Sequence, residues 1–187
     1  MDTNIPTVIV VTGPPGSGKT TLTHKLSKEL GCPAICRDEI KVGYVLTRNK
    51  SHEELGDDVN ANVSDIFFEV VNTYLKYGVT IIIEAAFQHK VWAPRLQGIK
   101  NMASLKLVIC NVDSLLAFER RQRRLLENPN RTRFHGEKMM ETSIDLASLQ
   151  SYDPPSLDFP TLHVDTTNGY EPDFEEILKF VMNDNGQ

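Results

Sequence analysis

The sequence has few cysteines and no long apolar run, and each shortage excludes a class of protein. Its cysteines, Cys32, Cys36 and Cys110, are odd in number and stand in or beside apolar runs, which fits reduced thiols better than a disulfide framework. A zinc site is not expected, because Cys32 and Cys36 have no second pair of closely spaced ligands. The first apolar run, Val8–Val11, is too short for a signal sequence or a membrane span. We therefore expect a cytoplasmic protein that makes no contact with a membrane.

Basic residues and aromatic residues are also in short supply. The net charge of -5 argues against a protein that binds nucleic acid through its whole surface, while local basic clusters leave phosphate binding open. An apolar share of 40% and a charged share of 24% are ordinary for a globular chain, and 187 residues suit one hydrophobic core. We predict a single domain over residues 1–187.

Five short β-rich runs alternate with helical stretches, which is typical of βαβ units and a parallel sheet. The runs in the middle of the sheet lack polar alternates, as in strands that helices cover on both faces. The sequence therefore predicts an α/β three-layer sandwich with a five-stranded parallel sheet. Its strands are expected at Thr7–Thr12, Pro33–Cys36, Val79–Glu84, Leu105–Val112 and Thr161–Val164.

The helices between these runs show apolar residues at three-four spacing. The clearest is predicted at Val59–Tyr77, with Gly78 at its C-terminal end, and Leu22, Leu26 and Leu30 mark the buried face of the first helix. We assign these leucines to the core and not to function.

A phosphate-binding motif lies between the first strand and the first helix. Residues 13–20 satisfy the P-loop pattern G-x-x-x-x-G-K-[ST], in which backbone N–H groups and the helix N-terminus face the β-phosphate of a nucleotide. Lys19 is predicted to reach the β- and γ-phosphates, and the Thr20 hydroxyl to bind Mg²⁺. The alternative is a plain glycine-rich turn. The predicted ATP-binding residues here are Gly13, Pro14, Pro15, Gly16, Ser17, Gly18, Lys19, Thr20 and Thr21.

The rest of the chain favours a kinase over other P-loop proteins. A GTPase would read guanine with Asn-Lys-x-Asp after a late strand, whereas Asn49-Lys50 is followed by Ser51-His52 after the second strand. An ATP-driven motor would usually carry an Asp-Glu pair at the end of a strand, where this chain has Glu84-Ala85. A regulatory switch and a motor are both disfavoured.

Asp38 lies just after the second strand, beside the P-loop in this topology and at the edge where α/β sheets bind ligands. Together with the P-loop and a later run of arginines, it makes the chain resemble the P-loop kinases of AAA type that include the polynucleotide kinase domain, chloramphenicol phosphotransferase and zeta toxin. The resemblance spans nearly the whole chain. It implies a nucleotide-kinase-like fold with strand order 2-3-1-4-5 and a short lid.

The resemblance also implies a catalytic role for Asp38, as the base that accepts the proton of the attacking hydroxyl. The alternative is that Asp38 only caps a helix beginning at Glu39, and the two roles are compatible. Arg37 and Lys41 are cations on either side of it, expected to contact the acceptor. Lys41 stands where polynucleotide kinase has an arginine, and a lysine binds phosphate less specifically, which weakens the case for a nucleotide acceptor.

Glu84 and Arg95 complete the predicted acceptor side. Glu84 ends the third strand, where the family commonly has Asp, and is expected to hold Mg²⁺ or orient the acceptor, unless it is a buried structural carboxylate. Arg95 resembles the family's basic residue that faces the acceptor, with a solvated helix arginine as the alternative.

Six arginines follow the fourth strand in an otherwise acidic chain. A charge run is usually a solvated face, but this place resembles the lid of small kinases, where arginines stabilise the transition state. Arg120 and Arg124 share one helical face and are predicted to bind ATP, with Arg124 catalytic. Segment 127–136 is predicted to be an exposed mobile loop that acts as the lid. The other arginines are Arg121, Arg123, Arg131 and Arg133, of which Arg131 or Arg133 is expected to arrive on closure.

These observations predict an ATP-dependent phosphotransferase that uses Mg²⁺ and acts on a hydroxyl of a small molecule. Asp165–Gly169 resembles the family's adenine-side loop, although a strand-to-helix turn explains it nearly as well. A polynucleotide 5'-hydroxyl kinase is the second candidate, disfavoured by the acidic balance and the few aromatic residues. An ATP-binding protein or ATPase without an acceptor is the third.

Overall fold

The computed structural model describes residues 5–139 and 151–183, which form an α/β sandwich around one parallel sheet. The five strands are ordered β2-β3-β1-β4-β5, as the resemblance implied. All four neighbouring pairs are parallel, so the carboxyl ends of the strands meet at one edge. The strands are β1 (Thr7–Thr12), β2 (Ala34–Cys36), β3 (Ile81–Glu84), β4 (Ser104–Asn111) and β5 (Thr161–Asp165).

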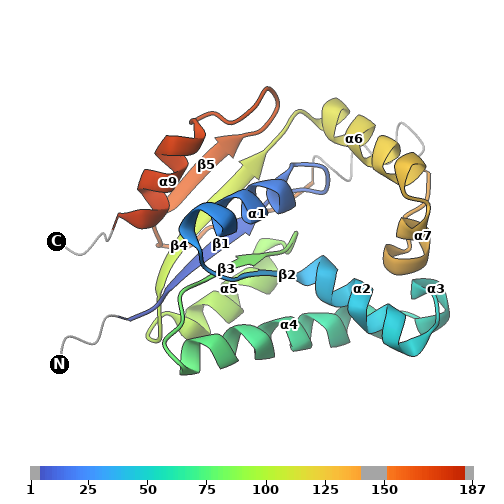
Figure 1. Cartoon of the computed structure of the whole chain (residues 1–187), viewed down its shortest axis with the longest axis horizontal. Coiled ribbons are helices and arrows are strands. Elements are labelled where there is room, and N and C mark those ends of the chain that lie inside the picture. The colour runs from blue at the N-terminus through green and yellow to red at the C-terminus, as the bar shows by residue number, and fades with distance from the viewer. Residues whose placement is uncertain (1–4, 140–150, 184–187) are drawn as a thin grey trace.

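Helices cover both faces of this sheet. Helices α1 and α9 pack on one face, and α4 and α5 pack on the other, so the predicted three layers are confirmed (Figure 1). The bounds of these four helices are α1 (Lys19–Leu30), α4 (Asp58–Lys76), α5 (His89–Ile99) and α9 (Phe174–Met182). Leu22 and Leu26 of α1 are fully buried, as their spacing indicated.

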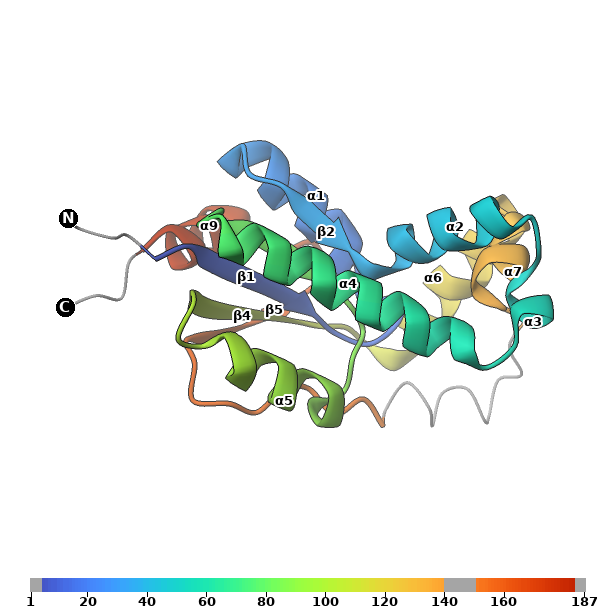
Figure 2. The ribbon, with the colours of Figure 1, turned by 90° about the horizontal axis from the view of Figure 1, so that it is seen from below.

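Among residues 5–139 and 151–183, four further helices lie beyond the carboxyl edge of the sheet. They are α2 (Arg37–Arg48), α3 (His52–Leu55), α6 (Ser114–Glu127) and α7 (Asn130–His135). Helix α7 contacts α2, α3 and α6, and Figure 2 shows it beside α6 and α3 at the end of the molecule away from both termini. Among the described residues, no helix is long and apolar enough to cross a membrane.

The prediction of a loop at 127–136 is wrong, because helix α7 occupies most of this segment. Pro129 precedes the helix at φ −60°, which suits a helix start, and Gly136 ends it in the left-handed conformation at φ +69°. The asparagines and proline resemble loop residues by composition, but here they frame a helix of six residues. Its role as a lid stays a prediction.

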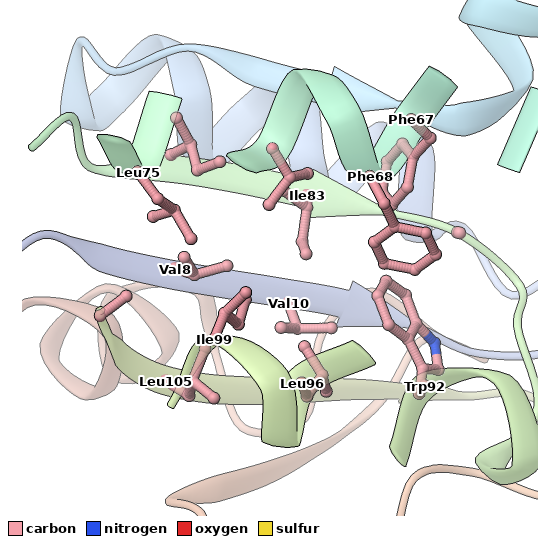
Figure 3. Close-up of a cluster of buried hydrophobic side chains, with 14 of the residues drawn as sticks. Val8, Val10, Phe67, Phe68, Leu75, Ile83, Trp92, Leu96, Ile99 and Leu105 are labelled. Carbon is pink, nitrogen blue, oxygen red and sulfur yellow. The ribbon is translucent and has the colours of Figure 1, made fainter. Parts of the chain in front are cut away.

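An aromatic cluster fills the core between β1, α4 and α5. Phe67, Phe68, Phe87 and Trp92 pack with ring centroids 5.1–6.2 Å apart, and the first two meet Trp92 beside the carboxyl end of β1 (Figure 3). Trp92 Nε1 donates to Thr12 Oγ1 at 3.0 Å, so the one polar group of the indole is satisfied in the core. Truncating such a buried ring typically costs about 3–5 kcal/mol. This cluster therefore fixes the end of β1, from which the P-loop starts.

A lysine is buried under the last helix. Lys106 of β4 is 1% exposed, and its Nζ donates to the carbonyl oxygens of Phe180, Val181 and Asn183 at the end of α9. The last carbonyls of a helix have no partner within the helix and carry partial negative charge. The ammonium thus satisfies the C-terminal end of α9 and ties it to the sheet.

Candidate active site

The P-loop joins β1 to α1 with a backbone that only glycine can adopt at two points. Gly13 has φ +154°, and a Cβ there would lie 2.4 Å from the carbonyl oxygen of Cys110. Gly16 has φ +89°, and its Cβ would lie 2.6 Å from the carbonyl oxygen of Ala117. Helix α1 then starts after Gly18 without a side-chain cap, which leaves its first N–H groups available to a phosphate.

A hydroxyl, a carboxylate and an ammonium meet beside this loop. Thr20 Oγ1 donates to Glu84 Oε2 at 2.9 Å, and Lys19 Nζ lies 3.8 Å from Glu84 Oε1. Glu84 is 3% exposed, and burial raises its pKa although Lys19 opposes the rise. A hydroxyl and a carboxylate are the hard oxygen ligands that Mg²⁺ prefers, so the pair fits the predicted metal.

Asp38 lies in the first turn of α2 and does not cap it. The helix starts at Arg37 and Cys36 is the N-cap residue, so the alternative in which Asp38 caps a helix beginning at Glu39 is wrong, and the role of Asp38 as base stays a prediction. Strand β2 leads into α2 without a loop, so the helix starts two residues earlier than Glu39. Burial alone would raise the pKa of Asp38, but His135, Lys19 and Arg37 outweigh burial and lower it. A carboxylate that stays ionised at neutral pH can accept a proton.

Asp38 and the P-loop line the same open cleft, which we call the carboxylate cleft. Its volume is about 390 Å³, and it brings together residues of the P-loop, α2, the turn after β3, α6 and the α7 segment. The Asp38 side chain is 57% exposed, so it is accessible to a ligand in the cleft. The predicted residues along the cleft are Pro15, Lys19, Thr20, Asp38, Lys41, Arg121, Arg124 and Arg131.

Two cations beside Asp38 share one acceptor on α4. Arg37 Nη2 donates to Asn60 Oδ1 at 2.9 Å, and Lys41 Nζ donates to the same oxygen at 3.0 Å. Lys41 is only 4% exposed, and burial, with help from Arg37, lowers its pKa to about 8. Lys41 lines the cleft, whereas Arg37 is held by Asn60 and by Asp38 at 3.2 Å.

Arg124 lies between the carboxylate cleft and a second cavity. The second cavity, of about 440 Å³, is lined by the P-loop and the β5–α9 turn, with Gly16, Thr21 and Thr166 among its residues; we call it the P-loop cavity. Arg124 lines both, and its buried Nε has no partner among the described residues. Burial and the neighbouring Arg131 lower its pKa. Glu137 and Asp38 act on this guanidinium from a distance, but its Nε–H has no hydrogen-bond acceptor among the described residues, and a triphosphate oxygen could supply one.

Arg120 differs from Arg124 although both occupy the same helical face. Arg120 donates to the carbonyl oxygens of Thr166 at 2.8 Å and Gly16 at 3.4 Å. It therefore joins the P-loop to the turn after β5, and Thr166 Oγ1 supports the same junction by donating to the Ser17 carbonyl at 2.9 Å. Its donors are committed to backbone carbonyls, so we assign it to shaping the P-loop cavity. Thr166 and Gly169 of the predicted adenine-side loop also line that cavity.

Other predicted residues lie away from the cleft or are paired. Arg95 is not among the residues lining the cleft: it pairs with Asp65 of α4 at 2.9 Å and stacks on Phe68. Arg123 faces the P-loop cavity. Arg133 lines a larger cavity of about 560 Å³ between α3 and α7, which contains no other predicted site residue. Arg131 forms a two-pronged pair with Glu137 at 2.6 and 2.8 Å, facing the cleft.

Four residues of the site were missed by sequence reasoning. His135 and Glu137 come from and beyond α7 and line the carboxylate cleft, and Asn60 holds Arg37 and Lys41. Burial lowers the pKa of His135. Tyr152 shares a 2.6 Å hydrogen bond with Thr12 Oγ1 and donates to the Phe87 carbonyl. None of them belongs to a local motif, since each is brought to the site by the tertiary fold.

The fold and this site define a P-loop protein of the nucleotide-kinase type. Residues 8–144 match the model of the AAA_33 family, an AAA domain, and the match spans more than half of the sequence. The chain therefore belongs to the AAA_33 family, and the predicted resemblance to P-loop kinases is confirmed. No curated protein gives a significant sequence match to it.

Solved structures agree with this assignment. A provisionally assigned kinase from Chloroflexus aurantiacus is 26% identical with a TM-score of 0.83, over 95% of this chain and 97% of that one. A sugar kinase from Janibacter is 18% identical with a TM-score of 0.62, over 94% of each chain. The APS kinase of Mycobacterium tuberculosis, solved with AMPPNP and APS, is 15% identical with a TM-score of 0.63, over 96% and 99%. The last two establish a shared fold with small-molecule kinases.

Proposed function

We propose that the protein transfers the γ-phosphoryl group of ATP to a hydroxyl group of a small molecule. One observation carries this proposal: Arg124 lies between the P-loop cavity and the carboxylate cleft, and its buried Nε has no hydrogen-bond partner among the described residues. A phosphoryl group in transit between a donor in the first space and an acceptor in the second would pass beside this guanidinium. Arg124 would then stabilise the charge that spreads over the equatorial oxygens.

The donor side is argued from the P-loop. The glycine backbone and the uncapped N-terminus of α1 suit the β-phosphate, and Lys19 would reach the γ-phosphate when ATP is bound. Thr20 and Glu84 would hold Mg²⁺, which supplies neutralising charge to the phosphate oxygens when bound. Glu84 would serve there as a carboxylate, because a bound cation opposes the burial that raises its pKa.

The acceptor side is argued from Asp38. Its lowered pKa keeps it ionised, so it can accept the proton of the acceptor hydroxyl while the new O–P bond forms and the bond to ADP breaks. His135 and Lys41 face the same cleft. Lys41, with a pKa of about 8, would gain from a negatively charged acceptor, since an anion stabilises its protonated form. This favours an acceptor with a carboxylate or phosphate group.

Phosphate transfer from radiolabelled ATP to pools of candidate acceptors tests the proposal. The pools should contain neutral sugars and alcohols, hydroxy acids and sugar phosphates, nucleosides, and 5'-hydroxyl oligonucleotides, each assayed with the wild type and with Lys19→Ala. We expect labelled product from one pool of small molecules and none from the variant. Transfer confined to oligonucleotides would identify the protein as a polynucleotide kinase. ATP hydrolysis that no pool redirects into product would refute the proposal.

A further inference from the structure

Three metal-binding side chains from different elements meet on the side of the sheet opposite Trp92. They are His24 of α1, Cys36 at the end of β2 and Glu39 of α2, and one ligand atom from each lies within 4.8 Å of the others. Nothing in the proposed phosphotransfer uses His24 or Glu39 in this way. The sequence analysis expected no zinc site, because it considered Cys32 and Cys36 together; the fold instead brings Cys36 and Glu39 to His24, twelve residues before Cys36.

The distances are close to the edges of a tetrahedral site, although His24 and Glu39 are paired directly in the absence of an ion. His24 Nε2 lies 2.9 Å from Glu39 Oε1 and 3.7 Å from Cys36 Sγ. Zinc bonds of about 2.0–2.3 Å place neighbouring ligand atoms of a tetrahedron about 3.3–3.6 Å apart. Small side-chain rotations would therefore bring all three ligand atoms to the distances of a tetrahedral zinc site. The side chains of His24 and Glu39 are 53% and 57% exposed, so an ion can enter from solvent and water can complete the fourth position.

The donor set and the surrounding charge select the ion. Thiol, imidazole and carboxylate together suit Zn²⁺, whereas Mg²⁺ prefers oxygen ligands throughout. Burial raises the pKa of the Cys36 thiol, and the negative charges of Glu84, Glu39 and Asp38 raise it further; the same negative charges favour a cation at the sulfur. We infer that His24, Cys36 and Glu39 form a second metal site that binds Zn²⁺, separate from the Thr20–Glu84 pair.

Binding of zinc would release one proton from Cys36 and would link two helices. The ion displaces the thiol proton of Cys36, which leaves to solvent, and the sulfur binds as a thiolate. Asp38 lies between Cys36 and Glu39 in sequence, so the ion would tie the first turn of α2 to α1 (Figure 1). Zinc would thereby fix the segment that carries the proposed base.

Titration of the untagged protein with Co²⁺ in excess Mg²⁺ tests the site, since cobalt bound to thiolate gives a charge-transfer band in the near ultraviolet. We expect one cobalt per chain with this band, and displacement by stoichiometric Zn²⁺. Cys36→Ser should lose the band, whereas the matched control Cys32→Ser should keep it. His24→Ala should weaken zinc binding by about tenfold or more, against an unchanged affinity in the control His163→Ala.

Circular dichroism verifies that each variant is folded. If Cys36→Ser fails to fold, His24→Ala and Glu39→Gln decide the question, because both side chains are largely exposed. A wild type without the thiolate band would overturn the inference. So would a band that survives Cys36→Ser, or a zinc affinity that neither His24→Ala nor Glu39→Gln lowers.

Discussion

Replacing the buried Lys41 by methionine is expected to change how the stability of the protein depends on pH. Lys41 is 4% exposed, and burial lowers its pKa from 10.5 to about 8. Below pH 8 the folded and unfolded states both carry the proton, so stability does not change with pH through this group. Between about pH 8 and 10.5 the unfolded state binds more protons, and the stability of the wild type therefore rises with pH.

The size of this effect follows from the shift in pKa. Each pKa unit corresponds to about 1.4 kcal/mol, and a shift of this size gives about 2.5 kcal/mol between pH 7 and pH 10. Solvent in the adjoining cleft screens the charge, so we expect about 1–2.5 kcal/mol. Methionine does not titrate, and Asn60 Oδ1 keeps its hydrogen bond from Arg37 when Lys41 is absent. The variant should thus lack the rise without leaving this acceptor unpaired.

Urea unfolding at pH 7, 8, 9 and 10 measures the effect. The stability of Lys41→Met relative to the wild type should fall by about 1–2.5 kcal/mol across this range. Lys28→Met, at an exposed position of α1, provides a control whose difference from the wild type should stay constant. The reasoning would be refuted by a constant difference for Lys41→Met as well, since the lysine would then titrate alike in both states.

The remaining predictions concern the proposed reaction. Millimolar ATP with Mg²⁺ should raise the melting temperature by about 5–10 °C, as a ligand at 100 times its Kd stabilises by about 2.7 kcal/mol, and Lys19→Ala should remove most of the shift in a thermal melt. Asp38→Asn should lower the rate of phosphoryl transfer about 100-fold or more, while isothermal titration shows an unchanged ATP affinity. Transfer at the wild-type rate would mean that another residue is the base, with Glu84 as the next candidate. Arg124→Ala should lower kcat more than it weakens ATP binding, and a pure loss of affinity would contradict its place between the two cavities.

The strands could be predicted because their burial leaves a direct mark on the sequence. Residues such as Ile81, Ile82 and Ile83 are fully buried between two helical layers, so the run carries no polar alternate. The strand was predicted to begin at Val79, but the Val79 N–H still bonds the Tyr74 carbonyl in the turn that ends α4. Strand order came from the resemblance, since apolar runs do not record which neighbours they meet.

Site residues could be predicted where they belong to one short sequence motif. Residues that the tertiary fold brings to the site could not. The P-loop and Asp38 follow directly from strands that end at one edge. Helical spacing correctly put Arg120 and Arg124 on one face, but it could not show that Arg120 meets backbone carbonyls. His135 was missed because α7 is short, and its position depends on tertiary contacts such as the 3.5 Å bond from Lys41 to the His135 carbonyl.

The lysine beneath α9 makes the end of the described chain costly to remove. A chain shortened to stop at Lys179 would lose the carbonyl groups of Phe180, Val181 and Asn183, which accept hydrogen bonds from the Lys106 ammonium. Loss of these three acceptors would raise the cost of keeping the protonated ammonium of Lys106 in the core. Deletion would then loosen β4, the strand that pairs with both β1 and β5, so the loss of the last turn of α9 would affect the middle of the sheet.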